Sequence, residues 1–254
     1  MSISEFKAFE TRLRKKWREI PATRMERQFS SDLLDYSDKQ LIEYWEECKS
    51  QTVLENVRGW YQKVYQYQVR NKKMLELGAG LGIDGIFFAE NGAHLTFADI
   101  VEDNLTLLRR ICKLKGISAD FYFIDDFFHF NFSHFFDLIL AVGSLINVPL
   151  EFAKKEFHAL SPWLLQGGRL LMLAYPYERF IASGTSSGED FAKTTDGERT
   201  PWIEWYDQSK VMQLVGPEFS INWWRNFGTD NIEFNWFELS KLSYRGLTEI
   251  QQLC

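Results

Sequence analysis

A short apolar run followed directly by alternating glycines is the feature that most restricts how this chain can fold. The run, MLEL at 74–77, leads into GAGLGIDG at 78–85. Glycines between a strand and a helix allow a tight backbone turn and leave main-chain N–H groups open to a ligand. The segment therefore predicts a strand, a ligand-binding loop and a helix, in that order.

Further short apolar runs follow at intervals that leave room for a helix between neighbours. They lie at 94–100, 119–125, 136–142 and 168–175, and turn or cap residues bound each of them. Strands that alternate with helices form a mostly parallel sheet wrapped by helices. We therefore predict an α/β fold with a doubly wound, Rossmann-like sheet.

The chain divides into an N-terminal helical cap and this sheet domain. Within residues 1–70, apolar side chains recur at three- and four-residue spacings, and neither Pro nor Gly interrupts 22–58. We predict a helical cap over 1–70 and a Rossmann-like domain over 71–254. Residues 176–215 are too long for a simple connector, so we expect them to form a flap.

Composition restricts the partners and the compartment. With 29 Lys plus Arg against 35 Asp plus Glu, the net charge is −6 and the pI about 5.4, which argues against nucleic acid as a partner. The three cysteines show no Cys-x-x-Cys spacing, and no stretch has eighteen uninterrupted apolar residues. We expect a cytoplasmic protein with no metal and no membrane segment; the oligomeric state stays open. Aromatic residues reach 16%, which indicates a large core or an apolar pocket.

The glycine spacing alone allows two kinds of nucleotide site. Gly78-x-Gly80-x-Gly82 suits an adenosylmethionine loop, whereas Gly80-x-Gly82-x-x-Gly85 satisfies the dinucleotide fingerprint. In the dinucleotide fingerprint the first glycine follows the strand directly, but here Gly78 and Ala79 intervene. The placement favours the adenosylmethionine reading.

Carboxylates follow the second and third predicted strands. Asp99 ends the second strand, where an acid can accept hydrogen bonds from ribose hydroxyls; it also suits a helix N-cap. Asp125 and Asp126 end the third strand, where one of them can accept from an adenine amine while Phe127 covers the ring. These positions match the needs of a bound adenosine.

At these residues the sequence resembles the class I S-adenosylmethionine-dependent methyltransferases. The resemblance rests on ELGAGLG, FADI, FIDD and FDLILAVGSL, in this order, and covers about Lys73 to Tyr175. It implies a C-terminal antiparallel hairpin, for which 220–228 and 232–239 are candidates, and S-adenosylmethionine as the cofactor, with S-adenosylhomocysteine as the product. The cofactor contacts it implies are Glu76, Gly78, Ala79, Gly80, Gly82, Asp99, Ile100, Asp125, Asp126, Phe127, Val142, Gly143, Ser144 and, from the cap, Tyr61.

The acceptor side is expected at the carboxyl ends of the strands, where the flap lies. Its polar and aromatic side chains suggest an apolar pocket with a carboxylate or tyrosine base and an arginine clamp. A structural flap, whose aromatic residues pack on the sheet, is the alternative. The candidate bases are Glu204, Tyr206 and Asp196, with Glu198 as a further carboxylate, and the candidate acceptor contacts are Tyr177, Arg179, Arg199, Trp202 and Trp205.

The sequence therefore predicts a methyltransferase acting on an oxygen or nitrogen nucleophile of a small molecule or short peptide of the natural-product type. Its alternatives are a sugar or secondary-metabolite O-methyltransferase, a non-catalytic adenosylmethionine-binding subunit and a nicotinamide-dependent oxidoreductase. The basic run at 12–18 could meet phosphate or an acidic peptide, but it is expected to be a solvated helix face.

Overall fold

The computed structural model describes residues 3–20, 27–54, 59–229 and 232–243. The chain separates into two compact units, Met1–Asp125 and Asp126–Cys254. Each unit has its own strands, helices and buried side chains.

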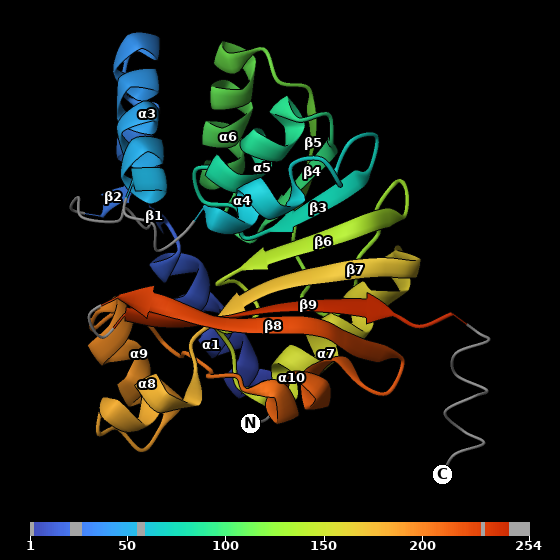
Figure 1. Cartoon of the computed structure of the whole chain (residues 1–254). Helices are drawn as coiled ribbons and strands as arrows, with labels where there is room; N and C mark the ends of the chain where they lie inside the picture. The colour runs from blue at the N-terminus through green and yellow to red at the C-terminus, as the bar shows by residue number, and fades with distance from the viewer. Residues whose placement is uncertain (1–2, 21–26, 55–58, 230–231, 244–254) are drawn as a thin grey trace. The chain divides into compact units, whose positions relative to one another are not determined.

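The first unit begins with helices and ends with three parallel strands. β4 pairs in parallel with β3 on one side and β5 on the other, and α5 and α6 pack against β4 (Figure 1). The predicted N-terminal helices are present, although a short antiparallel pair, β1 and β2, interrupts them. The elements are α1 (Ile3–Lys16), β1 (Glu19–Ile20), β2 (Gln28–Phe29), α2 (Ser30–Leu34), α3 (Asp38–Leu54), α4 (Trp60–Tyr65), β3 (Lys73–Leu77), α5 (Ile83–Glu90), β4 (His94–Asp99), α6 (Glu102–Lys115) and β5 (Ala119–Phe123).

The second unit combines one parallel strand pair with an antiparallel hairpin. β6 and β7 are parallel, β9 runs antiparallel to β7, and β8 pairs with β9 at the edge. Figure 1 shows α7 and α10 side by side below this part of the sheet, and the two helices are in contact. The elements are β6 (Phe136–Val142), α7 (Leu150–Leu160), a 3-10 turn (Ser161–Trp163), β7 (Leu164–Ala174), α8 (Tyr177–Ala182), α9 (Gly188–Asp196), α10 (Gln208–Val215), β8 (Phe219–Thr229) and β9 (Ile232–Lys241).

The strand order is β5-β4-β3-β6-β7-β9-β8. The order reverses after β3, as expected for a doubly wound sheet, and the two antiparallel strands come last. The prediction of a mostly parallel Rossmann-like sheet with a C-terminal hairpin is confirmed. The predicted flap at 176–215 contains α8, α9 and α10.

Aromatic side chains fill the core of each unit. Trp45, Tyr61 and Phe97 are fully buried in the first unit, and Trp236 and Phe157 in the second. Large rings of this kind each remove a large apolar area from water, so they supply much of the stability of a core. Part of the aromatic excess in the composition is therefore core packing.

Candidate active site

The loop between β3 and α5 contains three glycines in the left-handed region. Gly78, Gly80 and Gly82 have φ of 67°, 55° and 64°, a conformation that L side chains rarely adopt. The indole N–H of Trp45 donates to the carbonyl of Leu81 at 2.9 Å and ties the loop to α3. At Gly80 a Cβ atom would meet no heavy atom within 4 Å. The N–H of Gly78 also donates to the carbonyl of Ala98 at 2.8 Å. The loop is therefore held at Gly78 and Leu81 and open at Gly80.

The position at which β3 ends helps to decide between the two glycine patterns, the adenosylmethionine loop and the dinucleotide fingerprint. The strand ends at Leu77, so Gly78, and not Gly80, is the first glycine after it. Gly85 lies in the first turn of α5, where a Cβ would come within 2.1 Å of Glu76 Oε2. Gly85 thus allows α5 to pack closely on β3. Both glycine patterns are compatible with this role. The left-handed Gly78 favours the adenosylmethionine register.

Glu76 and Asp84 bring two carboxylates into the buried space behind this loop. Burial, followed by the charge of Asp84, raises the pKa of Glu76 well above its ordinary value. Glu76 Oε2 is buried with no hydrogen-bond partner among the described residues. Asp84 accepts from the hydroxyl of Tyr61 at 2.9 Å and from the amide of Gln62 at 2.7 Å. The predicted cofactor residue Tyr61 thus lies beside the first turn of α5, where it binds Asp84. Gln62, which the sequence does not single out, binds the same carboxylate.

Asp99 is the last residue of β4 and is 4% exposed. Its Oδ1 accepts from the N–H of Val101 at 2.8 Å and from the side-chain amide of Asn104 at 3.2 Å. Burial raises the pKa of Asp99 to about 6, although these donors oppose the shift. Asp99 is not the N-cap of α6, because that position is Val101, which makes no side-chain capping bond. A structural role as an N-cap does not account for this acid.

Arg14 of α1 joins the ends of β4 and β5. It donates to the carbonyl of Ile100 at 2.5 Å and to that of Asp125 at 3.1 Å, and it pairs with Glu10 at 2.6 Å. Lys16, from the same basic run, is 3% exposed and pairs with the buried Glu19. The prediction of a solvated helix face is therefore wrong for Arg14 and Lys16. The sequence could not show this, because nothing in the basic run distinguishes these two residues from the other cations.

The two carboxylates after β5 differ in their surroundings. Asp126 Oδ1 accepts from the N–H of Phe128 at 2.8 Å, so this acid closes its own turn. Both acids are exposed, and at Asp125 the atom that Arg14 binds is the backbone carbonyl oxygen. Phe127 is buried. Of the two acids, the structure favours Asp125 as the one whose carboxylate can serve a ligand.

A tight turn follows β6 in the second unit. Gly143 has φ of 71°, and its N–H donates to the Leu173 carbonyl at 3.1 Å. The amide of Asn147 donates to the carbonyls of Gly143 and Ser144. Ser144 Oγ is buried with no hydrogen-bond partner among the described residues. Val142, Gly143 and Ser144 are half-buried, and their contact with a cofactor stays a prediction.

The flap is attached to the strand ends of the second unit by backbone hydrogen bonds. The N–H of Tyr206 donates to the Tyr175 carbonyl at 2.9 Å, and the N–H of Glu204 donates to the Ile146 carbonyl at 2.7 Å. Trp205 forms an isolated bridge with Tyr175. These bonds place the segment around Trp205 at the end of β7.

The candidate bases in the flap are differently placed. Glu204 already accepts from the N–H of Leu150, the indole of Trp202 and the ammonium of Lys210. Tyr206 is fully buried, and this burial, with nearby acids, raises its pKa well above the ordinary value. Asp196 is the last residue of α9 and is half-buried. Glu204 and Tyr206 hold the flap in place, whereas a role of Asp196 as base stays a prediction.

The candidate acceptor residues fall into two groups. Tyr177 and Trp205 lie together, with ring centroids 4.6 Å apart, and Arg179 stacks on a neighbouring ring at the end of β7. Trp202 instead donates to Glu204 and packs against Gly188, where a Cβ would come within 2.3 Å of its ring. Arg199 is exposed. The structure brings Tyr177, Trp205 and Arg179 to one end of β7 and uses Trp202 inside the flap.

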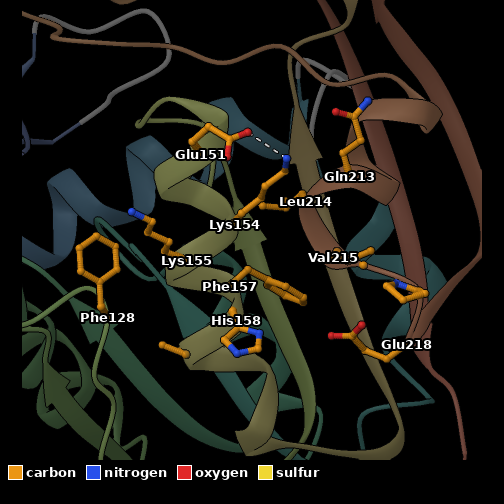
Figure 2. Close-up of a pocket in the computed structure, with 13 residues that line it drawn as sticks. Phe128, Glu151, Lys154, Lys155, Phe157, His158, Gln213, Leu214, Val215 and Glu218 are labelled. Atoms are coloured by element: carbon orange, nitrogen blue, oxygen red, sulfur yellow. Dashed lines mark hydrogen bonds and ion pairs between the residues drawn. The ribbon is translucent and has the colours of Figure 1, made fainter. Parts of the chain in front are cut away.

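A separate cavity of about 760 Å³ lies between α7 and α10. Figure 2 shows Phe157 and His158 of α7 facing it and Glu218 on the opposite wall, with the Glu151–Lys154 ion pair at its rim. None of the predicted site residues lines this cavity. Its walls combine acidic and basic side chains with apolar rings.

Neither a metal-binding cluster nor a membrane-spanning helix occurs within the described ranges. No cluster of His, Cys, Asp or Glu in them could hold a metal ion. No helix in the same ranges is long and apolar enough to cross a membrane.

Comparison with known proteins gives one sequence relative of partial length. No protein-family model matches the chain. A protein of Dictyostelium discoideum named histidine protein methyltransferase 1 homolog is 30% identical over 131 residues, which are 48% of this chain and 41% of that protein. The chain thus matches less than half the length of that relative.

The fold is that of S-adenosylmethionine-dependent methyltransferases. A magnesium protoporphyrin IX methyltransferase from Synechocystis, solved with bound S-adenosylmethionine, superposes with a TM-score of 0.58 over 92% of this chain and 97% of that one, at 16% identity. The N-methyltransferase NodS from Bradyrhizobium japonicum, solved with S-adenosylhomocysteine, gives 0.58 over 91% and 99%, at 12% identity. At such identities the likeness establishes the fold, and what these proteins bind concerns this chain only as support for a proposal.

Proposed function

We propose that this chain binds S-adenosylmethionine at the glycine loop and transfers its methyl group to an oxygen or nitrogen nucleophile. The acceptor is a small molecule or a short peptide of the natural-product type. The support comes from the fold, from the residues at the carboxyl ends of β3, β4 and β5, and from the solved neighbours that hold this cofactor or its product.

The observation that carries the proposal is the combination of the open loop with the buried acid. Gly78, Gly80 and Gly82 are all left-handed, and the space at Gly80 is open. Asp99 lies at the end of the adjacent strand, with one oxygen held by Val101 and Asn104. Such an arrangement fits a nucleoside, because main-chain N–H groups and one oriented carboxylate can meet its polar groups.

The residues of the first unit would bind and orient the cofactor. We assign the methionine part to the loop at 78–82 and the ribose hydroxyls to Asp99, and we assign the adenine amine to the exposed Asp125. Glu76 and Asp84 would set the charge behind the loop, with Tyr61 holding Asp84. When bound, the cofactor supplies an activated methyl group, so alignment and the exclusion of water can provide most of the acceleration.

Glu204 and Tyr206 are not assigned as general bases in this proposal. Glu204 is fully engaged by three donors, and Tyr206 is buried with a raised pKa. An amine acceptor needs only to be neutral, whereas a hydroxyl acceptor needs a base within hydrogen-bond reach. Asp196 is the candidate for that role.

A protein acceptor is the second candidate, because the partial-length relative carries the name of a histidine protein methyltransferase. Imidazole is a nitrogen nucleophile that is largely neutral at pH 7, so it needs no base. Incubation with tritium-labelled S-adenosylmethionine and either a protein extract or a small-molecule extract separates the two candidates by where the label appears.

Calorimetric titration of the purified chain with S-adenosylmethionine, S-adenosylhomocysteine and NAD tests the cofactor assignment. We expect both adenosyl ligands to bind with Kd values of about 10 µM or tighter, roughly −7 kcal/mol, and NAD to give no signal. Binding of NAD alone would establish the dinucleotide register, and silence from all three ligands would contradict the proposal. Binding without methyl transfer to either extract would support a non-catalytic subunit.

A further inference from the structure

Arg179 at the start of α8 has no carboxylate partner among the residues in the described ranges. Its guanidinium lies over the ring of Tyr175, with 4.3 Å between its central carbon and the ring centroid, and 5.8 Å from the ring of Phe234. The Nη1 atom is buried and has no hydrogen-bond partner among the described residues. Stacking accounts for the position of the guanidinium plane, but it leaves this donor unused.

Other arginines of the chain pair with carboxylates, as Arg179 does not within the described residues. Each of four has a carboxylate within 3.4 Å, and no such pair involves Arg179 among the residues that the structure describes. A buried donor with no acceptor is unfavourable, and a charged one is more so. An anionic oxygen is the partner that removes this penalty. The four paired arginines are Arg14, Arg109, Arg110 and Arg169.

Further aromatic rings belong to α8 itself and to the segment that pairs with Tyr175, the residue on which Arg179 stacks. Tyr177 packs on Trp205 at 4.6 Å and on Phe180 at 6.3 Å between ring centroids. Tyr177 is 41% exposed, and α8 has no buried residue. Within the part of the chain that the structure describes, this helix therefore presents an exposed aromatic side chain at the end of β7, where Trp205 is attached.

The neighbouring lysine does not supply the same charge. The ammonium of Lys210 lies 3.6 Å from the centroid of the Trp205 ring, but it is paired with Glu204. Of these two cations, Arg179 is the one with no carboxylate partner in the described part of the chain. A planar guanidinium is suited to a carboxylate, because two parallel N–H groups match its two oxygens.

We propose that the acceptor is an aromatic or flat apolar molecule that carries a carboxylate, and that Arg179 binds this carboxylate while Tyr177 and Trp205 contact the apolar body. This inference rests on the proposed function, since it names the class of molecule to be methylated. Arg179 here is a recognition residue, and the carboxylate it binds is a handle for orientation. The proposal predicts discrimination between an acid and its amide, which have almost the same shape.

The experiment measures binding of matched acid and amide pairs by ligand-observed NMR, with and without saturating S-adenosylhomocysteine. The probes are benzoate, phenylacetate and 2-naphthoate, each beside its carboxamide. We expect the carboxylates to bind about tenfold tighter than the amides, and the larger ring to bind tightest. In Arg179→Gln this preference should disappear, and in Arg179→Lys it should fall partway, because a lysine keeps the charge and loses the planar pair of donors.

Arg109→Gln is the matched control. Arg109 also stacks on a ring, with 5.1 Å to the Phe121 centroid, but it already pairs with Glu102. This variant should keep the acid preference of the wild-type chain. The unfolding temperature and the affinity for S-adenosylhomocysteine show that each variant is folded.

The two proposals fail in different ways. Equal binding of acids and amides by the wild-type chain, no binding of either, or an acid preference that survives in Arg179→Gln would overturn the carboxylate inference. In that case normal S-adenosylhomocysteine binding would leave the proposed function standing. Loss of S-adenosylhomocysteine binding with intact acid discrimination would contradict the proposed function and retain Arg179 as a carboxylate site.

Discussion

The glycine loop and the flap differ in what builds them. Around Gly78–Gly82 the backbone conformation is specified by residues without side chains, and the neighbouring acids Asp84 and Asp99 are held by side-chain donors of their own unit. In the flap, positions depend on large side chains, such as Trp205 on Tyr177 and Arg179 on Tyr175. Backbone specifies the first region, and side-chain packing specifies the second.

This difference predicts that substitutions in the two regions affect different properties. A loop made from main-chain groups and one or two acids changes little when other surface residues change, so cofactor binding is preserved. A surface made from Tyr177, Arg179 and Trp205 can be altered by single substitutions that do not disturb the sheet. We therefore expect substitutions in the two regions to separate binding of the cofactor from turnover of the acceptor.

Gly85→Ala should produce the largest effect. Its Cβ would come within 2.1 Å of Glu76 Oε2 and 2.8 Å of the Phe97 ring, and overpacking of this kind costs about 3 kcal/mol of unfolding free energy. Gly80→Ala is the comparison, because it meets no neighbour and should lose only about 1 kcal/mol through its left-handed φ. Urea unfolding of both variants measures the difference, and equal losses would show that the loop is not packed as described.

Glu156 of α7, the helix in contact with α10 of the flap, tests how a buried acid affects the free energy of unfolding. It lies in α7, is 5% exposed, and burial raises its pKa to about 8. A raised folded pKa stabilises the protein at low pH, and this contribution is lost as pH rises from about 4.5 through 8. We expect Glu156→Gln to gain about 2 kcal/mol relative to wild type between pH 6 and pH 8. Urea unfolding at both pH values checks this, and parallel pH profiles would refute it.

Asp99→Ala should weaken binding of S-adenosylhomocysteine by about tenfold or more, or 1.4 kcal/mol. The reason is loss of the carboxylate assigned to the ribose hydroxyls. Asp120→Ala removes an exposed acid from β5 and serves as the control. Calorimetry on both variants, with unfolding temperatures as a check of folding, gives the comparison. Unchanged affinity in Asp99→Ala would remove this acid from the site.

The pH dependence of binding provides a milder test of the same residue. Since the pKa of Asp99 is about 6, the ionised fraction falls about tenfold between pH 7 and pH 5. We expect the affinity for S-adenosylhomocysteine to fall by a similar factor in the wild-type chain and to be flat in Asp99→Asn. A wild-type affinity that is constant over this range would show that ionised Asp99 is not needed.

Trp205→Ala should have the smallest effect on the cofactor and a clear effect on the acceptor. The ring packs on Tyr177 in the flap, so we expect the affinity for S-adenosylhomocysteine to change by less than about twofold. Methyl transfer to whichever extract is labelled should decrease. A large loss of cofactor affinity with unchanged turnover would reverse the division between the two regions.

The sequence predicts the sheet well because each strand is a short buried run bounded by turns. The predicted strands at 74–77 and 136–142 agree with β3 and β6, and the hairpin is found where the resemblance indicated it. The glycine loop is predictable because left-handed backbone needs glycine. The sequence does not separate Asp125 from Asp126, because their difference depends on a turn that one of them closes.

The sequence does not predict contacts between residues that lie far apart in the chain. Nothing in the basic run distinguishes Arg14, which binds carbonyls more than eighty residues away. Glu204 has the residue type of a general base, but its carboxylate accepts from the distant N–H of Leu150 and from the side chains of Trp202 and Lys210. Such roles depend on tertiary packing and not on local pattern.

A crystal structure of the chain with S-adenosylhomocysteine tests the central claim most directly. The account predicts the methionine part against the loop at 78–82 and a carboxylate oxygen of Asp99 within about 3 Å of each ribose hydroxyl. It also predicts that the Asp125 side chain, and not that of Asp126, lies near the adenine amine. A ligand bound away from the glycine loop, or a ribose with no contact to Asp99, would contradict the account.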